Sequence, residues 1–411
     1  MSGIVHIPFV YAGLMLMSIL MLYLAGRSFA KHDYKWTFMS VVGIVFVMLN
    51  EGLRFGRGFD YNVYARGFLD YALGYADKHE WLFLQIYKVI YWLGGDWQMM
   101  VLFMSCVLIY SYAILGKAYQ ERAMYVLPCM FLLTYSITEN LMRWFLACSL
   151  IWIALSIYLR DKGKWAYALG FAIAGCAIHN AVIPIPIIYF FLEKVKRPIM
   201  APLYSTIIFF ALVFLFETSW MMRFTGLFND MIQGMNLISE GRFDSYGSDT
   251  EYWLTSGFAG TERSVIKNQR TVTLLWVTII WAGYRLKTKN PNYTFAYNAS
   301  WMGFILFPVV AQIELLNRFN FMFVIFAGVV WGYCIEEFLR ARYSRFASII
   351  ILLVFLNHPR MALMRPFKEN PYCYMYVWDK GNREYLDVYK YYMDDHFAKQ
   401  CNQKFYRQLG F

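Results

Sequence analysis

The sequence predicts an all-α fold, that of a polytopic integral membrane protein with about 12 transmembrane helices. Of its 411 residues, 59% are hydrophobic and only 16% are charged, whereas soluble domains carry about 25% charged residues. Apolar stretches of roughly bilayer length also follow one another along the whole chain. Aromatic residues, which are included in the hydrophobic share, make up 20% of the chain, and their amphipathic rings favour the membrane interface.

Twelve apolar segments are expected to form the membrane helices: 5–25, 36–53, 97–116, 122–137, 141–159, 165–178, 180–193, 199–220, 270–287, 296–316, 319–338 and 344–357. A full crossing needs about 20 residues, so the segments at 165–178 and 180–193 are short. Pro184 and Pro186 are expected to break the second of these. We therefore expect a bent hairpin around His179, with its opened backbone buried in protein or lining a cavity.

Basic residues gather in alternate short connections, as is typical of cytoplasmic loops. They are Arg27, Lys31 and Lys35; Lys117 and Arg122; Arg160, Lys162 and Lys164; Lys194, Lys196 and Arg197; Arg285, Lys287 and Lys289; and Arg340, Arg342 and Arg345. This alternation places both termini outside. It predicts a transmembrane helical domain over 1–357 with outer loops at 54–96 and 221–269, followed by an extracytoplasmic tail at 358–411. The net charge of +11 is scattered over many loops, so it indicates topology and no nucleic-acid surface.

Cysteine usage fits this topology. Five of the seven cysteines lie in predicted spans, where they are expected to be inert packing residues. Cys373 and Cys401 share the outer tail, and we expect them to form a disulfide in that oxidising compartment. No metal-ligand spacing such as C-x-x-C occurs, so no cofactor is predicted.

The densest group of charged residues closes the second predicted span. Arg54 and Arg57 stand there beside glycines that allow close backbone approach, a combination that suits a phosphate. Asp60 follows, flanked by Tyr61 and Tyr64, whose rings can stack on sugars and whose hydroxyls can hydrogen-bond them. The structural alternative is an interfacial anchor of snorkelling arginines within an aromatic belt.

Four single residues also stand at the predicted outer face. Glu80 precedes an amphipathic stretch and is either a general base or a carboxylate favoured by a helix N-terminus. Arg143 and Arg318 lie at outer turns, as functional cations or as basic anchors. His179, at the expected break, is either functional or a hydrogen-bonded structural residue. Cations and acid/base candidates on one side of the membrane suggest chemistry on a phosphorylated lipid.

Over about residues 36–340 the chain resembles the EpsG family of bacterial polysaccharide proteins. The resemblance rests on the order R-x-G-x-G-x-D-Y-x-x-Y after the second span, beginning at Arg54. It also rests on the acidic residue before an amphipathic helix, the arginine opening a later span, the histidine between two short apolar runs and the late arginine. The sequence departs from the family pattern at Arg57, which is an extra arginine, and at Trp144 and Asn180.

The resemblance implies a Wzy-type polymerase of O-antigen, capsule or exopolysaccharide, similar to multi-span glycosyltransferases that use lipid-linked donors. Such proteins join oligosaccharide repeat units carried on undecaprenyl pyrophosphate at the outer face of the bacterial inner membrane. The implied partners are this lipid-linked glycan and the bilayer, with a chain-length regulator left open and no nucleic acid.

The implied reaction needs arginines that neutralise the leaving pyrophosphate and a base that accepts the proton of the attacking hydroxyl. His179 is the first choice as base, followed by Asp60 and Glu80. The expected substrate-binding residues are Arg54, Arg57, Tyr61, Tyr64, Arg143 and Arg318. We expect an inverting reaction that needs no metal. A flippase or transporter of the same lipid, and an O-antigen ligase-like glycosyltransferase, remain alternatives.

Overall fold

The computed structural model describes residues 6–57, 61–72, 80–139, 141–217, 270–286, 290–310, 314–340, 345–368 and 374–379. Over these ranges the chain is helical, with one isolated antiparallel bridge between Arg54 and Tyr376. It forms two compact units. The first consists of residues 1–186 together with 359–411, and the second of residues 187–358.

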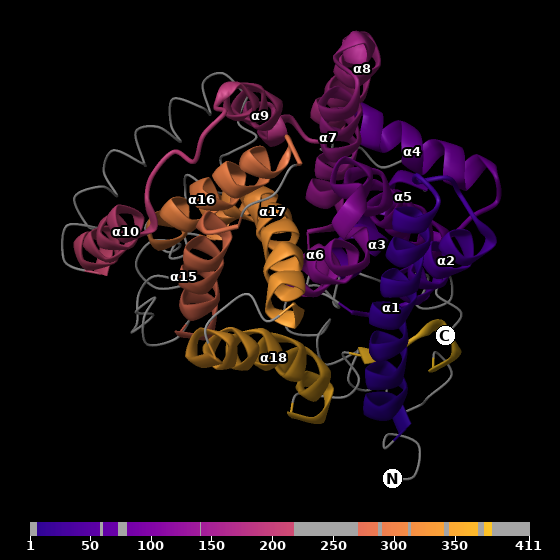
Figure 1. The fold of residues 1–411 in the computed structure, drawn as a ribbon. Coiled ribbons are helices and arrows are strands. Elements are labelled where there is room, and N and C mark those ends of the chain that lie inside the picture. Colours follow the sequence, from indigo (N-terminus) through magenta and orange to yellow (C-terminus); the bar gives the residue numbers. More distant parts are fainter. Residues whose placement is uncertain are drawn as a thin grey trace. The chain divides into compact units, whose positions relative to one another are not determined.

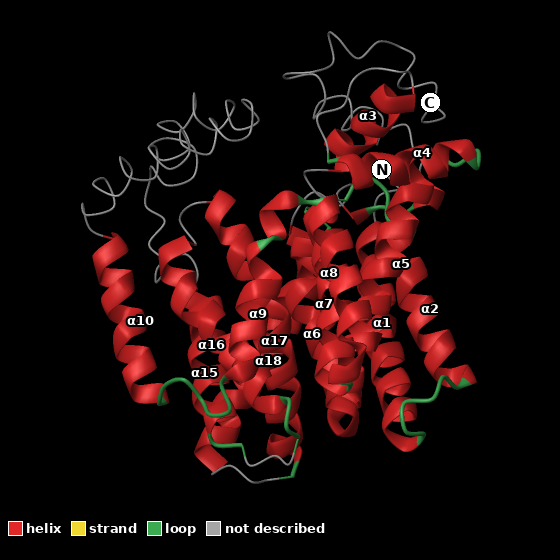
Figure 2. Cartoon of the chain, turned by 90° about the horizontal axis from the view of Figure 1, so that it is seen from above, coloured by secondary structure: helices red, strands yellow, loops and turns green. Residues whose placement is uncertain are grey.

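The first unit is a helical bundle (Figure 1). Its helices are α1 (His6–Lys31), α2 (Phe38–Gly52), α3 (Tyr61–Ala72), α4 (Trp81–Trp92), α5 (Trp97–Gly116), α6 (Ala123–Thr138), α7 (Met142–Arg160) and α8 (Trp165–Ile178). Helix α1 packs on α2 and α6, α2 on α5, α5 on α7, and α7 on α8. Figure 2 shows α3 and α4 at one end of this bundle.

Local sequence accounts for how α1 and α2 begin and pack. A capping box starts α2: the Ser40 amide donates to Thr37 Oγ1 at 3.2 Å, and the Thr37 amide donates to Ser40 Oγ at 2.8 Å. Helix α1 approaches the start of α6 at Gly26, where a Cβ atom would collide with the backbone carbonyl of Ala123. A small residue at such a contact is typical of helix packing in membranes.

The basic connections of the first unit lie at the end of the bundle away from α3 and α4. There the turn after α1 contacts the connection between α5 and α6. The Tyr34 hydroxyl donates to the Ala113 carbonyl at 3.1 Å, and Lys117 Nζ lies 5.5 Å from the centre of the Tyr34 ring. The turn after α1 and the connection after α5 therefore lie at the same end of this bundle. Which end faces the cytoplasm stays a prediction.

The second unit contains most of α9 (Pro184–Lys194) and of α18 (Arg345–Lys368), both of which cross its boundary, and all of α10 (Pro202–Glu217), α15 (Arg270–Tyr284), α16 (Tyr293–Val310) and α17 (Glu314–Leu339). Helix α10 packs on α16, and α15 and α16 pack on α17. Two indole N–H groups bind hydroxyls of α10: Trp301 donates to Ser205 at 2.8 Å and Trp281 to Thr206 at 2.9 Å. Hydrogen-bond partners within the protein stabilise such polar groups where the lipid offers no partner.

Every predicted apolar segment overlaps a helix, and the predicted amphipathic stretch after Glu80 is α4. Helix α18, however, continues to Lys368 and so includes the first residues of the segment predicted as the tail at 358–411. Among the described residues, four ranges are long and apolar enough to cross a membrane: His6–Lys31, Trp97–Tyr135, Met142–Arg160 and Arg318–Leu339. The range beginning at Trp97 contains both α5 and α6. The all-α membrane fold is thereby confirmed, whereas twelve crossings stay a prediction, as does the division into domains.

The break at His179 is present, but the prolines do not cause it. Helix α8 ends at Ile178, His179 is extended with φ −151° and ψ 107°, and a short 3-10 helix spans Asn180–Val182. Pro184 then begins α9, and Pro186 lies in the same first turn. The first amides of a helix have no intrahelical acceptor, so proline is tolerated there.

Several predictions fall on other parts of the sequence. The outer loop at 221–269, Asp60, and the Cys373–Cys401 pair all lie outside the described residues.

Candidate functional site

Three predicted site residues, which we call the Glu80 cluster, come together from distant parts of the sequence. Glu80 directly precedes α4, Arg143 lies in the first turn of α7, and His179 follows α8. Arg143 Nη1 donates to Glu80 Oε2 at 2.5 Å, and His179 Nδ1 lies 3.6 Å from Glu80 Oε1. The side chains of Arg143, Glu80 and His179 are 18%, 13% and 12% exposed. A substrate can therefore reach this cluster at its surface.

Glu80 links these segments and does not cap its own helix. It occupies the N-cap position of α4, yet its carboxylate forms no capping hydrogen bond. Instead Oε1 accepts from the Asn180 amide at 3.3 Å, so one carboxylate binds both sides of the break at His179 and the start of α7. The alternative of a simple helix N-terminal carboxylate is thus the weaker interpretation.

The neighbours of His179 suit a base that is held by a carboxylate. Its Nδ1 faces Glu80, and its ring meets Trp144 edge-to-face with centroids 5.1 Å apart. His179 Nδ1 lies beyond hydrogen-bond distance of Glu80 Oε1, so the carboxylate acts on the ring through its charge and favours the imidazolium that forms when the ring takes a proton.

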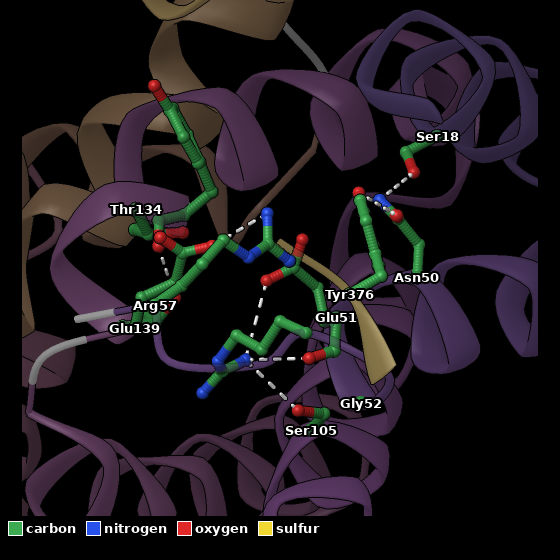
Figure 3. A network of polar contacts seen from close by, with 12 residues as sticks. Ser18, Asn50, Glu51, Gly52, Arg57, Ser105, Thr134, Glu139 and Tyr376 are labelled. Carbon is green, nitrogen blue, oxygen red and sulfur yellow. Dashed lines mark hydrogen bonds and ion pairs between the residues drawn. The ribbon is translucent and has the colours of Figure 1, made fainter. Parts of the chain in front are cut away.

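A second group, the buried charge cluster, contains Glu51, Arg54, Arg57 and Glu139 (Figure 3). Arg54 Nη1 lies 3.5 Å from Glu51 Oε2, and Arg57 Nη1 lies 3.3 Å from Glu139 Oε1. Two carboxylates thus face two guanidiniums, and their formal charges balance. Arg57 is 1% exposed, so in this conformation its guanidinium offers no surface to a phosphate.

Backbone geometry turns both arginines inward. Gly56 has φ +66°, a left-handed conformation that glycine adopts without strain, and it lies between Arg54 and Arg57. Arg54 Nη1 donates to the Glu51 carbonyl at 2.9 Å and to Ser105 Oγ at 3.2 Å. This turn directs both guanidiniums toward the bundle.

For each of the two arginines, burial and the neighbouring carboxylates shift the pKa in opposite directions. Burial lowers the pKa of Arg54, and Glu51 offsets this only in part. For Arg57, burial also disfavours the cation, but the Glu139 carboxylate and then Tyr376 outweigh burial and raise the pKa. Arg57 is therefore held as a cation within the protein by its own partners.

The two predicted sugar-binding tyrosines differ in exposure. Tyr61 is buried, and its hydroxyl donates to Gln98 Oε1 at 2.9 Å. Gln98 Nε2 in turn donates to the Gly52 carbonyl at 2.6 Å, which joins α3 to the end of α2. Tyr64 is partly exposed and stacks on Trp97 with centroids 6.3 Å apart. In this conformation Tyr64 is thus the ring with a surface available to a sugar.

Arg318 lies in the second unit, in the early part of α17, with its side chain partly exposed.

Sequence reasoning assigned no role to Glu139 or Tyr376. Glu139 had a detectable signal: a carboxylate at the end of an apolar helix needs a positive partner, and Arg57 was available on a neighbouring helix end. Tyr376 had none, since it is one of 33 tyrosines and its partner lies more than 300 residues away.

The model of one family, described as the EpsG family, matches residues 35–359. No curated protein and no solved structure matches the chain. The matched range includes the whole Glu80 cluster and the buried charge cluster. It ends before the segment Tyr374–Asp379.

Proposed function

From its membership of the EpsG family, to which this chain belongs, we propose that it polymerises repeat units carried on undecaprenyl pyrophosphate. The family and the apolar helices identify a membrane protein of polysaccharide biosynthesis with a polymerase-like glycosyltransferase function. The proposed reaction takes place at the outer face of the bacterial inner membrane and yields O-antigen, capsule or exopolysaccharide.

The observation that carries this proposal is the meeting of Glu80, Arg143 and His179 at a partly exposed surface. His179 Nε2 takes the proton from the acceptor hydroxyl, and Glu80 stabilises the resulting imidazolium. Because three distant segments are needed to form this cluster, a simple interfacial anchor explains it poorly.

The transfer itself is a displacement at the anomeric carbon of the growing chain. The acceptor oxygen forms the new glycosidic bond while the bond to the lipid pyrophosphate breaks, and the pyrophosphate leaves with the electron pair. Arg143 is proposed to stabilise the charge that develops on the leaving group. Direct displacement inverts the anomeric configuration, and guanidinium groups supply the positive charge that a divalent cation would otherwise provide.

Arg54 and Arg57 have a different place in the proposal. Each is buried and already paired with a carboxylate, so we assign them to support of the site. Tyr64 is proposed to line the sugar path, with Asp60 as the reserve candidate for the base.

The size distribution of surface glycan in a deletion strain of the native host tests the function. Loss of long chains with single repeat units retained supports a polymerase. Loss of every unit from the outer surface would instead indicate a flippase. Long polymer that remains on its lipid carrier would indicate a ligase. Complementation with wild type and with His179→Ala shows whether the Glu80 cluster is required.

A further inference from the structure

The segment Tyr374–Asp379 lies against the loop that follows α2. The Phe55 amide donates to the Met375 carbonyl at 3.0 Å, and the Val377 amide donates to the Leu53 carbonyl at 3.0 Å. These two bonds flank the antiparallel bridge between Arg54 and Tyr376. The backbone that carries both arginines is thus paired with a segment from near the other end of the chain.

Tyr376 enters the buried charge cluster (Figure 3). Its hydroxyl donates to Asn50 Oδ1 at 2.7 Å, and Asn50 Nδ2 donates to Ser18 Oγ at 2.8 Å. Its ring lies under the guanidinium of Arg57, 4.8 Å from ring centre to Cζ. A desolvated cation–π contact of this kind is among the stronger ones.

The segment has a second attachment at Asp379. Asp379 Oδ1 lies 2.9 Å from His6 Nε2, and Oδ2 accepts from the Tyr376 amide at 3.1 Å. His6 and the whole segment fall outside the range 35–359 that matches the EpsG family. His6 and the segment therefore lie outside the family match, whereas the loop after α2 that the segment contacts lies inside it.

Few groups besides Tyr376 orient Arg57. Its Nε and Nη2 have no hydrogen-bond partner among the described residues. The guanidinium is held by the Glu139 carboxylate and by the rings of Tyr376 and Tyr11, the latter at 5.4 Å. Removing the Tyr376 ring would thus take away one of the few groups that hold Arg57 in place against Glu139.

Glu139 connects this contact to the Glu80 cluster. It caps the end of α6, four residues before Arg143 in the sequence. Leu141, two residues before Arg143, is bonded to α6, since its amide donates to the Ile137 carbonyl at 3.2 Å. A shift of Glu139 would therefore move the start of α7, where Arg143 lies.

We propose that Tyr376 is a positioning residue of the polymerase: through Arg57 and Glu139 it sets the place of Arg143 beside Glu80. This inference rests on the proposed function and deepens it, because it assigns part of the site to residues outside the family match. A small displacement of a group that stabilises the transition state can cost up to about 10²-fold in rate.

The test is kcat and KM in proteoliposomes, with lipid-linked single units extracted from the deletion strain as substrate. We expect Tyr376→Leu to lower kcat by about 10- to 10²-fold with little change in KM. Tyr376→Phe keeps the ring and should stay within about threefold of wild type. Trp378→Leu is the matched control, because Trp378 stacks on Tyr376 at 4.6 Å but is 55% exposed and should leave kcat unchanged.

Coupling gives a readout that a purely structural contact would not produce. If Tyr376 acts through Arg57, adding Arg57→Lys to Tyr376→Leu should cause little further loss of kcat. A fall in melting temperature with kcat unchanged would overturn the proposal, as would equal effects of Tyr376→Leu and Trp378→Leu. If Tyr376→Leu does not fold, Tyr376→Met takes its place with the same expectations. Absence of polymer from wild-type protein would instead count against the proposed function.

Discussion

The two charged clusters of the first unit use the same residue types under different conditions. In the buried charge cluster, two arginines that are 3% and 1% exposed are paired with Glu51 and Glu139, whose side chains are 2% and 11% exposed. In the Glu80 cluster, one carboxylate is shared by Arg143 and His179, and all three side chains remain partly exposed. This difference shows that arginines close together in the sequence indicate positive charges that need a partner. The exposure of the side chains decides whether that partner can be a substrate.

Substitutions in the two clusters should also differ in whether they lower the stability of the protein or the rate of its reaction. A buried ion pair contributes little net stability, but removing one partner leaves an uncompensated charge. A catalytic group at the surface can be removed with a small effect on folding and a large one on rate. Substitutions in the two clusters can therefore be compared by their effects on stability and on rate.

The largest effect is expected at His179. His179→Ala should lower the transfer rate by about 10²–10⁴-fold, because a general base contributes a factor of that size. Polymer yield from lipid-linked single units measures it, at equal amounts of inserted protein. His32→Ala is the control: His32 is exposed and follows α1, and this variant should keep full activity. Polymer at wild-type level from His179→Ala would remove His179 from the mechanism.

Glu139→Gln should show the opposite profile, with a large effect on stability. It leaves the Arg57 charge buried without its carboxylate, which costs about 3–5 kcal/mol. Glu80→Gln is the matched substitution and should cost less than Glu139→Gln, because its partner Arg143 is 18% exposed whereas Arg57 is 1% exposed. Unfolding in mixed micelles compares the two. Equal destabilisation by both variants would contradict the distinction between the clusters.

Arg143→Lys should have an intermediate effect on rate. Lysine keeps the positive charge but loses the planar fork that contacts Glu80 and, in the proposed mechanism, the pyrophosphate. We expect a loss of about tenfold in kcat, with the protein still folded. Arg160→Lys, at the opposite end of the same helix, should be neutral. A fully active Arg143→Lys variant would reduce Arg143 to an anchor.

The smallest effect concerns metal removal. Since arginines are proposed to supply the positive charge at the leaving group, treatment with EDTA should leave the transfer rate within about twofold of the untreated rate. Loss of activity on EDTA treatment and its recovery with Mg²⁺ or Mn²⁺ would show that this part of the mechanism is wrong.

Much of the fold could be predicted from the sequence because membrane helices have strong local signals. Helix α5 occupies the predicted range 97–116, since an apolar run is bounded there by Asp96 and Lys117. The number of membrane crossings could not be fixed in this way, because helices as short as α9 need their packing to define them. The prolines of α9 were misinterpreted because the same residues can break a helix or begin one.

The site could be predicted in part. Topology alone placed Glu80, Arg143 and His179 on one side of the membrane, and the structure brings them into contact. The sequence could not show that Arg57 is buried, because the motif is the same whether its arginines face a ligand or a carboxylate. The pairing of Arg57 with Glu139 and Tyr376 depends on tertiary contacts among the loop after α2, the end of α6 and the segment Tyr374–Asp379, which no periodicity in the sequence reports.

The most direct test of the account is the single-turnover transfer rate of His179→Gln in proteoliposomes. Glutamine keeps hydrogen-bonding capacity at this position but cannot accept the proton of the acceptor hydroxyl. We expect this variant to bind the lipid-linked donor as wild type does and to transfer its glycan at least about 10²-fold more slowly. Transfer at the wild-type rate would contradict the account and would leave His179 as an orienting residue beside Glu80.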